Sequence, residues 1–192
     1  KCKRKNSPPP NVINPIAKWQ WWLRNIILRE KRNRLNNENF SIISCNCLGA
    51  MITHDLLQPQ LSPTVNLFIK ADDFIRFVSN IEEYLKYELI EAFDERMTFP
   101  VGKLKDVKIY FVHYKTFEEA KKKWQERRMR IRWDNLFLIF CEKDGCTYDH
   151  LLTFDALPYE NKVVIVHKPY PEIKCSYYFP GYEKTGEIGE IT

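Results

Sequence analysis

Short, nearly continuous runs of apolar residues alternate along this chain with stretches of helical periodicity. The apolar runs lie at 40–44, 64–69, 107–113, 136–140 and 162–167. Strands that are buried on both faces of a sheet have this continuous apolar character. Helical stretches of about 10–15 residues between such runs are typical of βαβ units. We therefore predict that these five segments are strands of one sheet.

The predicted fold class is α/β, namely a three-layer α/β/α domain over residues 38–192 with a mostly parallel sheet. Two alternating aromatic segments, 107–114 and 175–179, would add antiparallel strands and make the sheet mixed. Helices are expected near 48–57 and after Asp72, Thr116 and Thr147. Thr116-x-x-Glu119 is a capping box that begins one of these helices, and Thr147 begins another.

Residues 1–37 differ in character from the rest of the chain. Residues 1–13 form a basic, Pro-rich lead-in, and Asn14-Pro15 then provides an N-cap followed by proline at the first helical position. An amphipathic helix is predicted from there to Asn36-Asn37. Its apolar positions recur at three- and four-residue steps: Ile16, Trp19, Trp22, Leu23, Ile26 and Ile27.

The basic charge is concentrated in the same segment. Residues 1–34 hold ten Lys or Arg and one acid, Glu30, so they carry +9, whereas the other 158 residues carry −4. This split argues against a nucleic-acid surface over the domain. It favours an anionic membrane surface as a partner for residues 14–35. The alternative is that Trp19, Trp22 and Ile26 dock on the core or on a second subunit.

Composition excludes several classes of protein. With 44% hydrophobic residues the chain can form a core, and no apolar run is long enough for a spanning helix. Six cysteines are too few for a disulfide scaffold, and their spacing does not fit structural zinc. No metal or cofactor is expected. Because the N-terminus lacks an apolar signal core, we expect a cytoplasmic protein, peripheral at the inner face of the membrane if residues 14–35 bind there.

The first predicted strand ends in a polar turn, Cys45–Gly49, which should lie at the carboxyl edge of the sheet, where open α/β folds bind ligands. Cys47 is the candidate nucleophile or polar anchor, since a helix N-terminus lowers a thiol pKa. The alternative is that Cys47 is a buried thiol of the core. His113 is the candidate base. His54 is a second one, and Asp55 would orient it or contact a sugar hydroxyl.

A basic run follows at 121–132 and is the candidate phosphate clamp, since Arg and Lys suit anionic oxygens. The alternative is a solvated helix face. The proposed substrate-binding residues are Lys103, Arg127, Arg128, Arg130, Trp133, Asp134 and Asn135. The first four would hold phosphate, and the last three would offer a stacking ring and polar groups to a sugar.

Several stretches together resemble a known family. They are FSIISCNCLGAM at 40–51, LSPTVNLFI at 61–69, FPVGKL at 99–104, IYFVHYKTFEEAKKKW at 109–124, IRWDNLF at 131–137 and FPGYEK at 179–184. The chain resembles, over about 38–190, a bacterial domain family of unknown function commonly labelled exopolysaccharide or capsular polysaccharide biosynthesis protein. In the first turn Cys47 and Gly49 keep the family pattern, whereas Cys45, Leu48 and Ala50 depart from it. The resemblance implies an α/β fold and a role in cell-surface polysaccharide assembly, but no catalytic residues.

Two functions of different class follow. The first is a transferase or hydrolase that acts on a glycan or an activated sugar precursor, with a sugar phosphate or nucleotide sugar as ligand. The second is a non-catalytic accessory protein that binds a glycan intermediate or a membrane-bound polysaccharide synthase. A pocket that joins Cys47, His113 and the basic run would favour the enzyme.

Overall fold

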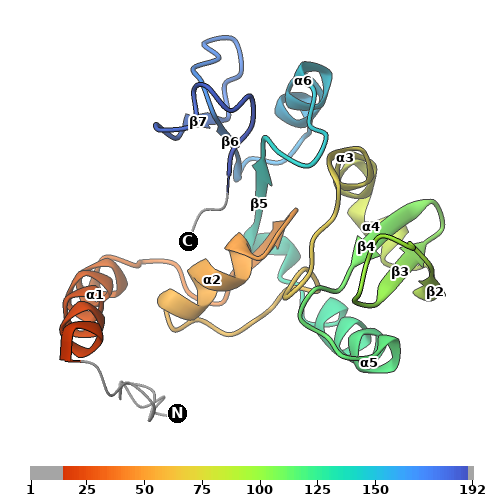
Figure 1. Ribbon diagram of the computed structural model, residues 1–192, viewed down its shortest axis with the longest axis horizontal. Coiled ribbons are helices and arrows are strands. Elements are labelled where there is room, and N and C mark those ends of the chain that lie inside the picture. The colour runs from red at the N-terminus through yellow and green to blue at the C-terminus, as the bar shows by residue number, and fades with distance from the viewer. Residues whose placement is uncertain (1–14, 190–192) are drawn as a thin grey trace.

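The computed structural model describes residues 15–189 and shows a mixed α/β protein with two separate sheets (Figure 1). The parallel sheet has the strand order β1 (Ser41–Ser44), β5 (Leu136–Cys141), β6 (Lys162–Val166) and β7 (Ser176–Tyr178). The antiparallel sheet has the order β2 (Ile90–Ala92), β3 (Val101–Leu104) and β4 (Val107–Tyr110). The helices are α1 (Pro15–Asn33), α2 (Leu48–Asp55), α3 (Ala71–Ser79), α4 (Ile81–Tyr84), α5 (Phe117–Arg128) and α6 (Tyr148–Ala156), with a 3₁₀ turn, η1, at Trp133–Asn135.

The prediction of one sheet is wrong for two of its five strands. The runs at 40–44, 136–140 and 162–167 become β1, β5 and β6, and they pair in parallel as expected. The run at 107–113 shortens to β4, which pairs antiparallel with β3 in the second sheet. Only two residues, Lys105 and Asp106, connect β3 to β4. The two strands therefore form a local hairpin, and β4 pairs with β3 rather than with a strand that is distant in the sequence.

The run at 64–69 is not a strand. Asn66 has φ +63°, in the left-handed region, and this interrupts the extended backbone. The segment instead connects the two sheets: Ile69 N donates to Cys45 O at 2.8 Å, and Phe68 forms a single bridge with Tyr110. Its apolar side chains are buried at this junction, as Leu67 shows, which explains why the run resembles a strand in the sequence.

The segment at 175–179 contains β7, but this strand pairs with β6 in parallel, so the antiparallel alternative is wrong there. The antiparallel character expected for 107–114 is present only in the second sheet. Two of the expected helix starts are confirmed, and a third differs by two residues. Thr116 and Thr147 are the N-caps of α5 and α6, whereas Lys70, not Asp72, precedes α3.

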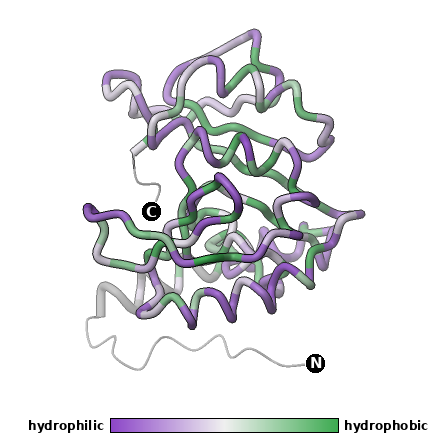
Figure 2. Tube along the Cα trace, turned by 90° about the vertical axis from the view of Figure 1, so that its right-hand side faces the viewer, coloured by the Kyte–Doolittle hydropathy of each residue, from purple (hydrophilic) through white to green (hydrophobic). Residues whose placement is uncertain are grey.

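One face of the parallel sheet forms the main core. Phe140 of β5 packs against Phe74 of α3 and Phe154 of α6, with ring centroids 5.4 Å from each. The same core continues through α3 to the antiparallel sheet and to Trp124 of α5. Figure 2 shows the hydrophobic segments in the interior of the molecule, with hydrophilic turns around them.

The opposite face of the parallel sheet is covered differently, and a three-layer arrangement is not confirmed. Here α2 packs at the β1 end, where Ile52 lies against a small cluster around Ile42 and Ile139. Over β5 and the start of β6 the face borders an open hollow of about 520 Å³, which we call the apolar groove. The residues that line it are Leu35, Asn37, Phe40, Ile42, Ile52, Leu56, Phe137, Leu138, Ile139, Glu160, Asn161, Lys162 and Val163.

The N-terminal helix is present as α1, although Asn14, its expected N-cap, lies outside the described residues. Arg32 near its C-terminal end donates from Nε to the carbonyl oxygen of Asp55 at 2.7 Å, which links α1 to the end of α2. Among residues 15–189, no helix has both the length and the apolar character needed to cross a bilayer.

Candidate functional site

A surface pocket of about 450 Å³ lies where α2, the 60–66 segment, the turn after β4 and α5 meet. We call it the histidine pocket. Its lining residues are Cys47, Ala50, Met51, His54, Asp55, Gln60, Val65, Asn66, His113 and Arg127. It therefore contains all four predicted catalytic candidates and one residue of the predicted phosphate clamp. His113 reaches it although β4 is not in the sheet of β1, because the 64–69 segment joins the two sheets at this point.

The turn after β1 places Cys47 at the start of α2. Asn46 closes this turn, since its Oδ1 accepts a hydrogen bond from Leu48 N at 3.0 Å. Ser44 Oγ accepts one from Gly49 N at 3.2 Å. A Cβ at Gly49 would lie 2.8 Å from Ile42 Cγ2, so only glycine allows α2 to approach β1 this closely. Cys47 is thereby fixed at the carboxyl end of β1, as the sequence predicts.

The Cys47 thiol does not have the predicted thiolate character. Its sulfur lies 3.7 Å from the carbonyl oxygen of Leu67 and donates to it. Burial raises the pKa of Cys47, and the bond to Leu67 offsets only part of this effect. The expected lowering of the Cys47 pKa is therefore wrong, because burial removes the solvation that the thiolate needs. A raised pKa favours the polar-anchor role of Cys47 over the nucleophile, and this role stays a prediction.

We expect Cys47 to react slowly with iodoacetamide near neutral pH. A raised pKa means that the thiol keeps its proton to higher pH, so the alkylation rate should still rise about tenfold per pH unit between pH 7 and 9. Mass spectrometry of the Cys47 peptide over a pH series measures this, with free cysteine as the reference. A rate that levels off below pH 8 would show a thiolate and restore Cys47 as a nucleophile.

Two neighbouring residues of α2 stand at the mouth of the pocket. The His54 side chain is 79% exposed, and its Nδ1 lies 3.5 Å from Asp55 Oδ1. The Asp55 side chain is only 26% exposed. Asp55 is therefore close enough to contact the His54 ring, and its role in orienting that ring stays a prediction. His54 thus has the exposure that a proton-exchanging group needs.

Arg127 forms the cationic wall of the pocket. Its Nη1 donates to the hydroxyl of Tyr114 at 2.6 Å and to Val65 O at 3.4 Å. Burial raises the pKa of Tyr114 against the opposing effect of Arg127, so the hydroxyl stays neutral. No carboxylate in the described part of the chain forms an ion pair with Arg127, and both of its described bonds use Nη1. Nε and Nη2 of the guanidinium therefore remain for an anionic ligand.

The other members of the predicted clamp lie outside the histidine pocket. Arg128 donates to the carbonyl oxygen of Leu85 at 2.7 Å and closes the end of α4. Arg130 is exposed and 3.9 Å from Glu126. Lys103 lies in β3 opposite Lys108. The basic run is thus divided between a pocket residue, a structural residue and a solvated surface.

The predicted sugar platform also lies elsewhere. Trp133, Asp134 and Asn135 form η1, ahead of β5. The amide of Asn135 exchanges two hydrogen bonds with that of Asn37, at 2.6 and 2.8 Å, and so fixes the connection from α1 to β1. These residues therefore adjoin the apolar groove rather than the histidine pocket.

A buried polar cluster at the carboxyl edge of the parallel sheet was not predicted as a site. Glu142 follows β5 and His167 follows β6, and their side chains are only 8% and 7% exposed. Glu142 Oε2 accepts from His167 Nδ1 at 2.6 Å and from His167 N at 2.9 Å. Its Oε1 accepts from the Tyr170 hydroxyl at 2.6 Å, and burial with this bond raises the pKa of Tyr170. The cluster joins the residues that follow β5 and β6 to Tyr170.

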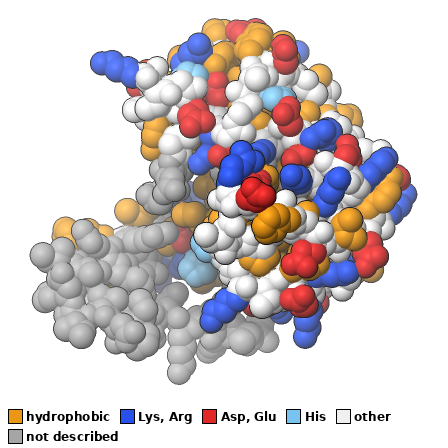
Figure 3. Space-filling view, turned by 45° about the vertical axis from the view of Figure 1, so that its right-hand side comes forward, with side chains coloured by type: hydrophobic (Ala, Val, Ile, Leu, Met, Phe, Trp, Pro, Cys, Tyr) orange, Lys and Arg blue, Asp and Glu red, His pale blue; other side chains and the backbone are white. Residues whose placement is uncertain are grey.

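No group of three or more His, Cys, Asp or Glu side chains within residues 15–189 is placed to hold a metal ion. Charges of both signs are interspersed over the face that Figure 3 shows, rather than gathered into one patch. The histidine pocket holds one guanidinium, Arg127, and one carboxylate, Asp55, together with two His side chains and the Cys47 thiol.

The fold and this pocket define an α/β protein with two sheets and a pocket that holds two histidines and an arginine at their junction. The chain belongs to the family described as domain of unknown function DUF1919, whose model matches residues 19–192. It is also similar to an uncharacterized protein of Haemophilus influenzae, with 45% identity over 168 residues that cover 88% of this chain and 81% of that protein. The resemblance to a family of unknown function is confirmed, and the polysaccharide role attached to it stays a prediction.

Proposed function

We propose that the histidine pocket binds a sugar phosphate or nucleotide sugar and that the protein is a transferase or hydrolase acting on this activated precursor. The observation that carries the proposal is that three segments bring Arg127, His54 and His113 to one pocket. Its volume of about 450 Å³ suits a ligand of this size. The resemblance to polysaccharide biosynthesis proteins supports the choice of a sugar, and we place the reaction in the cytoplasm.

Each group has a role in this chemistry. The Arg127 guanidinium pairs with phosphate oxygens and stabilises the charge of a leaving phosphate. An exposed histidine accepts the proton of the attacking water or acceptor hydroxyl, and His113, in the turn after β4, faces the pocket opposite α2. Gln60 and Asn66 offer amide groups to sugar hydroxyls. The raised pKa of the Cys47 thiol argues for direct transfer rather than a covalent intermediate on sulfur.

The test is a thermal-shift and calorimetry screen of the full chain against uridine and guanosine diphosphate sugars, sugar 1-phosphates, inorganic phosphate and the matching neutral sugars. We expect a rise in melting temperature with a phosphorylated sugar and none with the neutral sugar. His113→Ala and His54→Ala should lower turnover at least 100-fold for the true base, with the melting temperature of the free protein unchanged. Lys122→Ala, on the exposed side of α5, is the control.

The outcomes separate the two functions. Release of the nucleoside diphosphate or phosphate that depends on His113 or His54 supports the enzyme. Binding that depends on Arg127 without release, across the acceptors tested, assigns the non-catalytic accessory role instead. The absence of binding by every phosphorylated sugar overturns the proposal.

A further inference from the structure

α1 carries an exposed apolar stripe. Four of its large apolar side chains are between 47% and 60% exposed: Trp19, Trp22, Ile26 and Ile27. At about 100° per residue, the four fall within an arc of about 140° on one side of the helix. In Figure 1 α1 stands at the edge of the molecule, with α2 between it and β5. A continuous apolar stripe of this kind marks a surface that has a partner.

Basic side chains border the stripe on both sides. Arg29 and Lys31 are exposed, and they lie about 20° and about 40° outside the two edges of the apolar arc. The 19 residues of α1 hold five Lys or Arg and one acid, so the helix carries +4. The acid, Glu30, is itself paired with Arg34 just beyond the helix. The partner of this surface must therefore be anionic as well as apolar.

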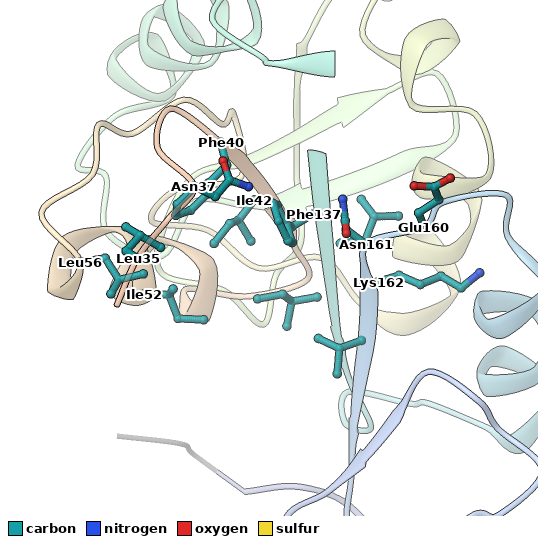
Figure 4. Close-up of a pocket in the computed structure, with 13 residues that line it drawn as sticks. Leu35, Asn37, Phe40, Ile42, Ile52, Leu56, Phe137, Glu160, Asn161 and Lys162 are labelled. Carbon is teal, nitrogen blue, oxygen red and sulfur yellow. The ribbon is translucent and has the colours of Figure 1, made fainter. Parts of the chain in front are cut away.

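The apolar groove does not meet this requirement. Figure 4 shows Glu160 and Lys162 together at one end of the groove, where an acid and a base offset each other. The bond from Arg32 Nε to the carbonyl oxygen of Asp55 also ties the end of α1 to α2. The surface of an anionic phospholipid bilayer does meet it, because acyl chains lie there directly beneath a layer of phosphate groups.

We propose that α1 lies in the interface of an anionic phospholipid bilayer, with its axis along the surface and its apolar stripe among the acyl chains. Interfacial helices carry Trp or other large apolar residues on one face and Lys or Arg on the other, and they enter to a depth of about 5–10 Å. Tryptophan favours this depth because its ring is apolar and its N–H group is polar. α1 lies on the membrane rather than across it, since no helix within residues 15–189 could span a bilayer.

The two basic borders have a defined role in this arrangement. The stems of Arg29 and Lys31 follow the apolar surface while their charged ends reach the lipid phosphates. Each basic group near an anionic membrane strengthens binding about fivefold. The docking also brings the histidine pocket next to the membrane, because Asp55, which accepts the bond from Arg32, lines that pocket. The proposal for α1 does not rest on what the pocket binds.

The first test is co-sedimentation of the full chain with vesicles of phosphatidylcholine, either alone or mixed with phosphatidylglycerol in about a 2:1 ratio. We expect binding to the anionic vesicles to be about 100-fold stronger than binding to the neutral ones. This binding should weaken as the salt concentration rises, because salt screens the attraction. Equal binding to the two kinds of vesicle overturns the proposal, and so does the absence of binding to the anionic ones.

The apolar stripe is tested by the double variant Trp19→Ala/Trp22→Ala. It should lower the partition coefficient on anionic vesicles about 50-fold, since about half of each ring becomes buried in lipid. Both side chains are exposed, so circular dichroism should be unchanged. Phe93→Ala is the matched control, because Phe93 is 81% exposed and follows β2 on the opposite side of the molecule from α1. It should bind like the natural sequence.

The basic borders are tested by Arg29→Gln/Lys31→Gln, which should lower the partition coefficient about 25-fold through the loss of two charges. Lys115→Gln/Lys122→Gln gives the same net charge at exposed positions in and just before α5, and it should bind normally. Equal loss in both charge variants would show attraction by net charge alone and overturn the role of α1.

Two further results overturn the proposal. One is unchanged vesicle binding by the tryptophan double variant. The other is a dimer in solution that this variant dissociates, without any vesicle binding, which assigns the stripe to a second copy of the chain. A failure of every phosphorylated sugar to bind the histidine pocket is a separate result, because vesicle binding is measured without a sugar.

Discussion

Replacing Glu142 with alanine is expected to lower the free energy of unfolding by about 3–5 kcal/mol, the cost of breaking a buried, hydrogen-bonded pair. The carboxylate accepts three hydrogen bonds, two from His167 and one from the Tyr170 hydroxyl. Alanine removes all three bonds and leaves the buried imidazole of His167 and the half-buried hydroxyl of Tyr170 without their acceptor. Urea denaturation followed by circular dichroism at pH 7 measures the loss.

Glu172 provides the matched control, because it also accepts a hydrogen bond from a tyrosine, Tyr148, at 2.7 Å, but on the exposed surface. Glu172→Ala should leave the urea midpoint nearly unchanged. The double variant Glu142→Ala/His167→Ala should lose clearly less than the two single losses together, because both residues belong to one network. A loss below about 1 kcal/mol for Glu142→Ala would contradict the structural role of the cluster.

Replacing Arg127 with alanine is expected to weaken binding of the phosphorylated sugar by about 100-fold, which corresponds to about 2.7 kcal/mol. Arg127 is the pocket's guanidinium, and Tyr114 and Val65 hold it in place before the ligand arrives. A preorganised fork loses little entropy on binding phosphate, so its removal costs affinity directly. Calorimetry with the ligand found in the screen measures the change.

Arg130→Ala is the matched control, since Arg130 lies two residues after α5 on the exposed surface, where its guanidinium is 3.9 Å from Glu126. It should leave the affinity unchanged. Arg127→Lys keeps the charge but not the fork and should fall between the two. Equal affinity in the Arg127→Ala and Arg130→Ala variants would remove Arg127 from the binding site.

The sequence predicts the parallel sheet well because its strands carry their own signal. β1, β5 and β6 are short apolar runs, and burial on both faces requires that composition wherever the partner lies. The antiparallel sheet is different. β2 and the Lys-containing β3 lie partly at the surface, so their composition is not distinctive. An apolar run also does not specify its partner, which is why β4 and the 64–69 segment were placed in the wrong sheet.

Some residues of the candidate site could also be predicted from the sequence, and others could not. Cys47 and His113 are candidates because each lies at the end of a predicted strand, and His54 because it lies beside Asp55 on the helix that Cys47 begins. The structure places all three in one pocket. Their catalytic role stays a prediction. Arg127 could not be separated from Arg128 by sequence, because neighbouring residues of a helix differ by only about 100° in direction and the exact orientation of α5 decides which of them faces the pocket. Glu142 and His167 carried a usable signal, since each is the first charged or ionisable residue after a buried strand.

The position of β1 at the edge of the parallel sheet has a consequence for how the chain folds. Its partner is β5, so the 91 residues from 45 to 135 must be spanned before β1 can pair, whereas only two residues separate β3 from β4. Loop closure of that length is slow, and local hairpins form first. We expect the antiparallel unit to fold early and β1 to join last during refolding. The histidine pocket, which needs α2 beside both units, then becomes complete only in the final step.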